Sequence, residues 1–425
     1  MQSLAERDYF TDFEILKDPY QFFEAVRAHG PVFRPANKDY LIVTGYEEAL
    51  EVLKNNKDFS AAIGVAGAGS PLPFHPHGSD ITAQIEENRS KIIGGTLLVN
   101  LDDDAHSNLR ALVNRLFVPS RLKANEAFIR DYSEELLTHA VANGGCDLIK
   151  DIATPFVTMV IADLLGVPKE DRQFFMDTIA NAPPPGSLNE SDNQTYDANH
   201  PMTVIGAYFA QYIIARQSDP RDDILTELAL ATYPNGEKPD IPTIAALATF
   251  MFGAGQDTSA KILGNSMMYI VDQPGLQEQL RADPSLIPLM LEEVLRLQGS
   301  TKQTARVARR DTRIGDHDVP AGTRVLLALA AANRDPNRWE CPHEFRLGRP
   351  KIVEHVGFGR GKHVCAGAPL ARVEVRILLE KLFDLTSQIE LDEEVHGPKG
   401  NRTYNFEPSF IIRGLESLHL KLTPR

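Results

Sequence analysis

Apolar residues recur every three or four positions along most of the chain, which is the spacing of one face of an α-helix. This pattern predicts helices over residues 20–27, 46–54, 106–117, 125–141, 152–165, 171–180, 202–216, 221–232, 241–272, 289–297 and 368–383. Breaker pairs such as Gly30 with Pro31 and Val118 with Pro119 end several of these segments. Helix is therefore predicted to dominate the fold.

Apolar and polar residues alternate in a few short stretches instead, which favours β-strands. These stretches are residues 40–44, 301–325 and 409–422. The predicted fold class is mainly α with small β-sheets at the edges. No low-complexity linker divides the 425 residues, so we expect one large domain over residues 1–425.

Composition and charge exclude several classes of protein. The chain is 43% hydrophobic and 24% charged, and its formal net charge of −14 argues against a general nucleic-acid binder. Its three cysteines show no CxxC spacing, so a disulfide framework and a zinc site are not expected, and a reducing cytoplasm fits best. The first residues lack the apolar core of a signal peptide, and the longest apolar run, 244–254, is too short to span a bilayer.

A glycine-rich stretch around one cysteine carries the strongest chemical signal. Residues 358–367 have the sequence FGRGKHVCAG, and the predicted helix 368–383 follows directly. Glycines permit tight turns, and a thiol just before a helix N-terminus sits in a field that favours its thiolate. We interpret Cys365 as a metal ligand, with His363 as a possible second one. The alternatives are a buried cysteine acting as a small hydrophobe, or a phosphate-binding turn, although no GxxxxGK[ST] is present.

A second signal lies inside the apolar helix 241–272, where residues 254–258 read AGQDT. Helical spacing places Phe250, Ala254 and Thr258 on one face. An acid and a hydroxyl in a buried helix are locally unfavourable, which favours a functional role for Asp257 and Thr258. The structural alternative is close helix packing at Gly255 with Thr258 bonded back to a backbone carbonyl.

A third signal is an acid and a base on the apolar helix 289–297. Glu293 and Arg296 are three positions apart. They form either an ordinary surface pair or part of a buried network, in which each charge needs a partner.

Together these motifs resemble the cytochrome P450 family. The spacing FGxGxHxCxG is similar to its haem-thiolate signature, and the other motifs follow in the family's order along nearly the whole chain. The resemblance implies a soluble, bacterial-type fold with haem b held by the Cys365 thiolate, which favours O–O cleavage. It implies a monooxygenase that inserts one oxygen atom from O2 into a small, mainly apolar organic substrate, by hydroxylation, epoxidation or O-dealkylation.

The resemblance also implies roles for individual residues. Asp257 would relay protons and Thr258 would hydrogen-bond the oxygen ligand. Arg349, or less favourably Arg346, would join Glu293 and Arg296 in a structural network. The haem contacts would be His106, Arg110, Ala254, Arg306, Phe358, Gly359, His363, Cys365 and Gly367. His363 is then better interpreted as a propionate partner than as a second metal ligand. Three acids precede His106 (Asp102, Asp103 and Asp104), where the family often has Asp-Pro-Pro, and they would suit a helix N-terminus.

The same resemblance assigns the substrate pocket and the larger segments. Its walls would include Leu97, Leu98, Val99, Phe250, Gly253, Lys302, Gln303, Ile411 and Ile412. The small residues Gly253, Ala254 and Gly255 would leave room for oxygen, and Lys302 either offers a charge to the substrate or points to solvent. Segments 60–100, 171–216, 241–272 and 355–383 would be the substrate roof, the lid helices, the oxygen-side helix and the cysteine loop with its following helix.

The chain has no room for its own flavin or iron–sulfur domain, so electrons must come from outside. A ferredoxin or flavodoxin with an NAD(P)H-dependent reductase is expected, docking on a basic patch of Arg115, Arg360, Lys362 and Arg372. Two alternatives stay open. One is a peroxide-driven peroxygenase of the same fold, which would lack the Asp257–Thr258 pair. The other is a haem-binding sensor or carrier without catalysis, which would leave that pair unexplained.

Overall fold

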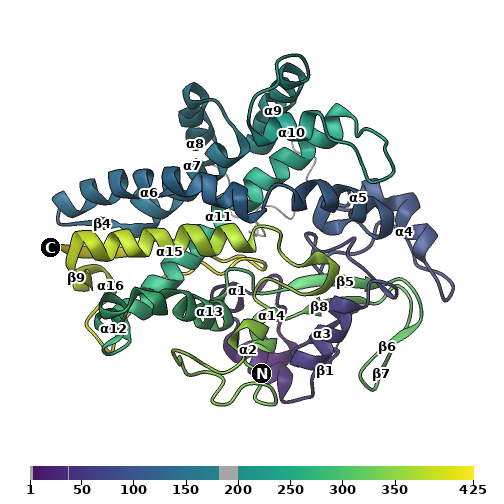
Figure 1. The fold of residues 1–425 in the computed structure, drawn as a ribbon. Helices are drawn as coiled ribbons and strands as arrows, with labels where there is room; N and C mark the ends of the chain where they lie inside the picture. The colour runs from purple at the N-terminus through teal and green to yellow at the C-terminus, as the bar shows by residue number, and fades with distance from the viewer. Residues whose placement is uncertain (1–2, 37, 181–199) are drawn as a thin grey trace.

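The computed structural model describes residues 3–36, 38–180 and 200–425, and it is mainly helical, as predicted (Figure 1). Most predicted helices are present with ends shifted by a few residues. The helices are α1 (Phe13–Lys17), α2 (Tyr20–Arg27), α3 (Tyr46–Lys54), α4 (Thr82–Asn88), α5 (Asp103–Asn114), α6 (Pro119–Ala142), α7 (Thr154–Leu165), α8 (Arg172–Ala180), α9 (Pro201–Ser218), α10 (Ile224–Ala229), α11 (Ile241–Asp272), α12 (Leu276–Ala282), α13 (Ile287–Gln298), α14 (Leu329–Ala332), α15 (Ala368–Leu385) and α16 (Glu393–His396). The part of the predicted lid over residues 181–199 lies outside the described residues.

Three small sheets accompany the helices. The strands are β1 (Val32–Phe33), β2 (Tyr40–Val43), β3 (Phe59–Ser60), β4 (Gly145–Asp147), β5 (Thr304–Ala308), β6 (Thr312–Ile314), β7 (His317–Val319), β8 (Arg324–Leu327), β9 (Thr386–Leu391) and β10 (His419–Pro424). Their orders are β1-β2-β8-β5-β3, β4-β10-β9 and β6-β7. The strand predicted over residues 409–422 is only partly correct, because β10 begins at His419 and the preceding residues form isolated bridges such as Thr301 with Ile412.

The long helix α11 passes through the middle of the molecule, behind α15 in the view of Figure 1. It packs against α7, α9, α13 and α15. Asp240 caps its first turn by accepting a hydrogen bond from the Thr243 amide at 2.8 Å. A helix that is apolar nearly all round is stable only when it is buried, and α11 supplies much of the largest hydrophobic cluster.

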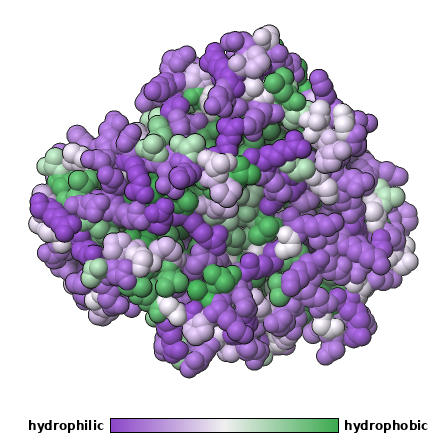
Figure 2. Space-filling model, in the orientation of Figure 1, coloured by the Kyte–Doolittle hydropathy of each residue, from purple (hydrophilic) through white to green (hydrophobic). Residues whose placement is uncertain are grey.

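The outer surface shows the complementary pattern. On the face drawn in Figure 2, hydrophobic residues form small separate patches between hydrophilic ones. Among the described residues, no helix combines the length and apolar character needed to cross a membrane.

A buried ionic network joins α13 to the segment that precedes the cysteine loop. The guanidinium of Arg296 donates to both oxygens of Glu293 at 2.9 and 2.8 Å, and Arg349 Nε donates to the same carboxylate at 2.9 Å. Arg346 contributes only its backbone N–H, at 3.0 Å. The remaining guanidinium donors reach backbone carbonyls, including those of Asn333 and Pro342. The network therefore fixes the chain that leads into the loop.

The neighbouring residue on α13 holds the loop itself. Arg372 of α15 donates to Glu292 at 2.5 and 2.9 Å, and the His355 ring lies 3.0 Å from the same carboxylate. Burial alone would raise the pKa of Glu292, but the bonds from Arg372 and His355 outweigh it and lower the pKa to about 2. The Arg372 guanidinium also lies over the Phe358 ring, 4.7 Å from its centroid. The start of the loop is thus clamped between α13 and α15.

A third contact sets α11 against α15. Glu374 of α15 is buried and hydrogen-bonds Ser259 of α11, the residue after Thr258. Burial raises the pKa of Glu374 to about 8, and the Ser259 bond only partly opposes this. The protonated form is therefore favoured in the folded chain over most of the physiological range.

Replacing Glu293 by Gln tests the first network. The change leaves two buried guanidinium groups without a counter-charge, so we expect a loss of about 3–5 kcal/mol in the free energy of unfolding, measured by urea denaturation. Glu344→Gln is the matched control, because its exposed side chain pairs only with Arg346 at 3.0 Å and the expected loss is below about 1 kcal/mol. Equal losses of unfolding free energy in the two variants would contradict the prediction that the buried ion pairs of Glu293 stabilise the fold.

Replacing Glu374 by Gln tests the α11–α15 contact through pH. A carboxyl whose folded pKa is raised contributes stability below its unfolded value, near 4.5, and this stability is lost as pH rises through about 8. At pH 9 the free energy of unfolding of the Gln variant should therefore exceed that of the parent by on the order of a few kcal/mol, measured by urea denaturation. This difference should vanish near pH 5. Asp384→Asn, at an exposed position of α15, is the control. A pH-independent margin would argue against a titrating Glu374.

Candidate functional site

The cysteine loop is held in a specific backbone conformation. The Cys365 amide donates to the Phe358 carbonyl at 2.9 Å, which closes the loop. Gly359 and Gly361 have φ values of +69° and +75°, and a Cβ at position 361 would overlap the carbonyl of Leu53 in α3. The glycines predicted to permit a tight turn are thus required by it.

Cys365 is exposed as a residue, although protein atoms crowd its thiol enough to affect its pKa. Burial raises its pKa, whereas the backbone N–H groups of Gly367 and Ala368 and the charge of Arg110 lower it. Those N–H groups favour a thiolate once a cation shares its charge. Cys146 differs, because burial and two nearby aspartates raise its pKa to about 12. The donor set at Cys365 therefore fits an axial thiolate ligand.

Four basic side chains gather next to this loop. The rings of His106 and His363 lie 4.1 Å apart between centroids, and Arg110 and Arg306 are close enough to affect His363 electrostatically. Burial, followed by the charge of Arg306, lowers the pKa of His363 to about 2, and burial lowers that of Arg306 to about 10. Three chain segments, α5, β5 and the cysteine loop, supply this cluster.

The charge of Asp102 acts on Arg306 and His106, but Asp102 itself accepts a hydrogen bond from Arg89. Within the described ranges, neither Arg110 nor Arg306 forms an ion pair, and Nδ1 of His363 is buried without a hydrogen-bond partner. Arg110 donates to Asn114, and Arg306 donates to the Ala305 carbonyl. Buried cations without counter-ions are unfavourable, so the site fits a bound dianion such as the two propionates of haem.

The acids before His106 have partners of their own. Asp102 accepts from the Ala61 amide at 3.0 Å and from Arg89 at 2.9 Å, and Asp103 accepts from Arg309 at 2.6 Å. The interpretation that these acids serve the helix N-terminus is therefore incomplete, since they tie α5 to β3 and the segment after β5.

The middle of α11 presents an accessible strip on an otherwise buried helix. Ala254 is exposed and Phe250 and Thr258 are partly exposed, whereas residues 259–264 are buried. The Thr258 hydroxyl donates to the Ala254 carbonyl at 3.0 Å. The face predicted to look onto the cofactor is thus the accessible one, and the back-bond of Thr258 exists alongside it.

Two of the three small residues predicted to leave room for oxygen also serve helix packing. A Cβ at Gly253 would lie 2.7 Å from Met202 Cε of α9, and one at Gly255 would lie 3.1 Å from Ile161 of α7. Only Ala254, between them, faces open space. Gly253 and Gly255 thus have a packing role beside the one predicted for them, because a larger side chain at either position would meet a neighbouring helix.

Lys302 shows a larger difference from its prediction. Its side chain is 0% exposed, and its ammonium donates to the carbonyls of Leu16, at 2.6 Å, and Ser409. Burial lowers its pKa well below the usual value. Both sequence interpretations, a charge offered to the substrate and a side chain in solvent, are therefore wrong. The neighbouring Gln303 is 1% exposed, and both of its amide atoms lack partners among the described residues.

The other predicted pocket residues are distributed between core and surface. Leu98 is buried in the largest hydrophobic cluster, and Phe250 packs against that cluster. Val99 is 37% exposed, whereas Ile412 is 4% exposed and forms a bridge with Thr301. Leu97 and Ile411 are partly exposed.

Sequence reasoning missed two residues of the site. Lys261 lies one turn beyond Asp257 on α11, 3.5 Å from its carboxylate, and its ammonium also bonds Glu407. The sequence signal available for Lys261 was a lysine in an apolar helix. Glu407 gave no signal, because it lies far from Lys261 along the chain.

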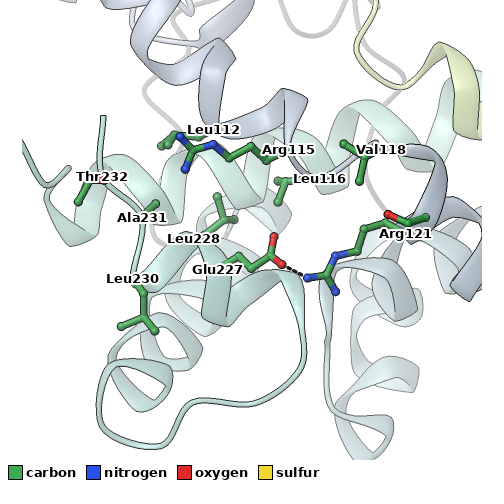
Figure 3. Close-up of a pocket in the computed structure, with 11 residues that line it drawn as sticks. Leu112, Arg115, Leu116, Val118, Arg121, Glu227, Leu228, Leu230, Ala231 and Thr232 are labelled. Carbon is green, nitrogen blue, oxygen red and sulfur yellow. Dashed lines mark ion pairs between the residues drawn. The ribbon is translucent and has the colours of Figure 1, made fainter. Parts of the chain in front are cut away.

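The expected basic patch is smaller than predicted. Arg372 is engaged by Glu292, and Arg360 donates to the Val353 carbonyl, which leaves Arg115 and Lys362 exposed. Arg115 lines a surface pocket of about 540 Å³ between the α5–α6 junction and α10, in which Arg121 pairs with Glu227 (Figure 3). None of the residues predicted to contact haem lines this pocket.

Comparison with known proteins agrees with this geometry. The sequence profile "Cytochrome P450" matches residues 193–387. Cytochrome P450 144 of Mycobacterium tuberculosis is 32% identical over 99% of this chain and 92% of its own length. The substrate-free structure of the Mycobacterium marinum cytochrome P450 CYP150A6 is 42% identical, with a TM-score of 0.92 over 99% of this chain and 100% of that one.

A more distant neighbour is P450BioI, solved in complex with an acyl carrier protein that bears hexadec-9Z-enoic acid. It is 27% identical, with a TM-score of 0.78 over 96% of this chain and all of its own. With the cysteine loop, the basic cluster and the acid–alcohol helix, these likenesses lead to one conclusion: the chain belongs to the cytochrome P450 family of haem-thiolate monooxygenases, whose cofactor is haem b.

Proposed function

We propose that this monooxygenase inserts one oxygen atom of O2 into a small, mainly apolar organic substrate, with electrons from a separate ferredoxin. The observation that carries the proposal is the exposed Cys365, whose thiolate is favoured by backbone N–H groups, beside four basic side chains whose two arginines form no ion pair in the described ranges. Haem bound there supplies the activation of O2 and the transfer of oxygen. We expect hydroxylation, epoxidation or O-dealkylation as the reaction type.

The side chains of this protein divide the remaining work. Cys365 would hold the iron, Arg110 and Arg306 would neutralise the propionates, and His106 and His363 would hydrogen-bond them. On α11, the hydroxyl of Thr258 is oriented by its hydrogen bond to the Ala254 carbonyl at 3.0 Å, which leaves its oxygen as an acceptor on the accessible strip. Asp257 is the residue before Thr258 and carries protons from solvent. A general acid–base catalyst must be ionisable and within reach of the proton that it transfers.

Two observations support an apolar substrate. The predicted walls are mostly hydrophobic side chains, as is usual in small-molecule sites, and the ammonium of Lys302 is turned to backbone carbonyls. Neighbours of known structure hold apolar ligands: CYP109E1 of Bacillus megaterium, 26% identical, was solved with corticosterone and with testosterone. Gln303, buried with free amide atoms, is the candidate for a polar contact with the substrate.

The electron donor is proposed from surface charge. Arg115, next to the end of α5, and Lys362, in the cysteine loop, are exposed, and the charge of Lys362 acts on His363. The chain as a whole carries a net charge of −14, so a local basic surface would steer an acidic ferredoxin or flavodoxin to this side.

Replacing Thr258 by Ala tests the oxygen-side role. Loss of the hydroxyl should divert electrons to hydrogen peroxide, so NADH consumption per product should rise several-fold while substrate affinity changes little. The measurement pairs NADH oxidation with peroxide and product yields, and Thr258→Ser is the control that keeps the hydroxyl. Tight coupling in the Ala variant would remove Thr258 from the mechanism. The reduced, carbon-monoxide-bound spectrum of each variant should keep the red-shifted Soret band of a thiolate ligand, and Cys365→His should lose it.

Reversing charge at Arg115 and Lys362 tests the docking surface. The double variant Arg115→Glu/Lys362→Glu should raise the ferredoxin concentration for half-maximal turnover by roughly tenfold at low salt, and the difference should shrink as salt screens the charges. Lys150→Glu, at an exposed position next to β4 and at the opposite side from α5 in Figure 1, is the matched control. An equal effect of the control would indicate a change in overall charge rather than a docking site.

A further inference from the structure

Lys261 is a charged residue inside the long, largely apolar helix α11. Its side chain is 5% exposed, although it lies in the second half of α11, one turn beyond Asp257. A buried ammonium needs partners, because its transfer out of water is strongly unfavourable. It has two: its Nζ donates to Glu407 and lies 3.5 Å from Oδ1 of Asp257.

The chain makes room for this arrangement from a distant segment. Residues 406–415, which we call the C-terminal hairpin, are joined by a bridge between Phe406 and Leu415 and by the Glu407 amide, which donates to the Gly414 carbonyl at 3.0 Å. A Cβ at Gly414 would overlap the Lys261 side chain. The hairpin therefore places the Glu407 carboxylate against Lys261, and the glycine at position 414 leaves space for the lysine side chain.

The cluster holds two carboxyl groups and one ammonium. Burial alone would lower the pKa of Lys261, but Asp257 and Glu407 outweigh it and raise that pKa, so the ammonium stays charged. Burial raises the pKa of Glu407, and Asp257 and Glu416 add to this while Lys261 opposes it. From the neighbouring strand segment, the Lys302 site also lies within electrostatic range of Glu407. Glu407 is thus the member of the cluster whose charge is most easily changed.

Each carboxyl group also keeps one free atom. Oδ2 of Asp257 and Oε2 of Glu407 are buried and have no hydrogen-bond partner in the described ranges. The ammonium is closer to Glu407 than to Asp257, so Asp257 is held by one oxygen and only loosely. A proton carrier needs this combination, because a carboxylate locked by a strong ion pair neither turns nor accepts a proton readily.

We propose that Lys261 is a positioning residue for Asp257, and that the carboxyl group of Glu407 sets how tightly Lys261 holds it. The inference rests on the proton-relay role proposed above for Asp257. When Glu407 is ionised, it draws the ammonium away and leaves Asp257 free to exchange a proton with water. When Glu407 is neutral, Lys261 pairs with Asp257 alone and holds it as a carboxylate. The ammonium gains and loses no proton in either state.

The first test is a double-mutant cycle on the haem-loaded, full-length enzyme. Asp257→Asn should slow turnover by roughly 10²-fold at an unchanged substrate KM, because one proton-transfer step loses its carrier. Lys261→Met should also lower kcat and increase the loss of electrons to peroxide, and the double variant should be no slower than Asp257→Asn, since both changes act through one group. Multiplicative effects of the two substitutions would overturn the proposal.

Comparing Asp257→Asn with Lys261→Met distinguishes a failure of the proton route from a failure of the role given to Lys261. If Asp257→Asn turns over at the parent rate, the proton route itself is wrong and the role of Lys261 falls with it. If Asp257→Asn is slow and Lys261→Met is normal, the route stands and only the inference about Lys261 is overturned. Lys302→Met is the matched control, since it removes another buried ammonium that touches the same hairpin but bonds only carbonyls. It should lower stability and leave the peroxide loss unchanged; a rise equal to that of Lys261→Met would overturn the proposal.

The second test needs no turnover. Infrared spectra of haem-loaded protein with ¹³C-labelled glutamate identify the Glu407 carboxyl band as the one missing in Glu407→Gln. Lys261→Met should raise the pKa reported by that band and Asp257→Asn should lower it, each by about 1–3 pH units, because the first removes a cation and the second an anion. A band that responds to neither substitution would show that the three groups are uncoupled, and would overturn the proposal.

Glu407→Gln covers the case in which Lys261→Met fails to fold. The substitution keeps the shape of the side chain and fixes it as neutral, so turnover should fall at neutral pH and become less dependent on pH than in the parent. A Glu407→Gln enzyme with the parent pH profile would contradict the role given to Glu407.

Discussion

Glu293 holds the guanidinium groups of Arg296 and Arg349 where neither its own side chain nor that of Arg296 has exposed surface. The fixed fork of each guanidinium matches carbonyl and carboxylate oxygens, so the network ties α13 to the residues that lead into the cysteine loop. The neighbouring residue on α13, Glu292, forms a similar buried network with Arg372 and His355. Cys365 therefore sits on a loop whose two ends are anchored to the same helix, and this rigidity lets a single thiolate act as a metal ligand.

Charge balance distinguishes the cofactor site from these supports. In the networks of Glu293 and Glu292, every buried cation faces a carboxylate or a backbone carbonyl. Around His106 and His363, four basic side chains meet without an ion pair at either arginine in the described ranges, and the pKa of His363 is lowered to about 2, first by burial and then by these neighbours. The same principle that explains the structural networks thus indicates that the second cluster is completed by a bound dianion.

The sequence predicts those features that depend on local spacing. Helical periodicity predicts α11 with its correct ends, and the glycine spacing predicts the turn at Cys365. The resemblance favours Arg349 over Arg346, and in the structure the Arg349 side chain donates to Glu293 whereas Arg346 contributes only its backbone N–H. What local spacing cannot supply is a partner from a distant segment. Gly253 and Gly255 were predicted only to leave room for oxygen, and their packing against Met202 and Ile161 could not be read from local spacing. Asp103 suited a helix N-terminus, yet its partner is Arg309.

The two buried lysines show the same limit most clearly. Lys302 lies in the polar stretch 300–304, whereas Lys261 lies in the apolar helix α11, yet both side chains are buried. Lys302 bonds only the carbonyls of Leu16 and Ser409, so burial lowers its pKa, whereas Lys261 bonds carboxyl groups and its pKa is raised. Both lysines attach to the C-terminal hairpin, which carries the predicted pocket residues Ile411 and Ile412.

That attachment bears on how specificity can vary. Three hydrogen bonds hold the hairpin. The Lys261 ammonium donates to Glu407, the Lys302 ammonium donates to the Ser409 carbonyl, and the Asn265 amide donates to the Arg413 carbonyl at 3.1 Å. These contacts use buried charges and backbone groups, and losing any of them leaves an unsatisfied polar atom in the core. The backbone of this predicted pocket wall is therefore fixed by buried groups outside the predicted set of pocket side chains at 411 and 412. New specificity at the hairpin is more easily reached through the side chains at 411 and 412 than by moving the segment, since movement would also disturb the cation that contacts Asp257.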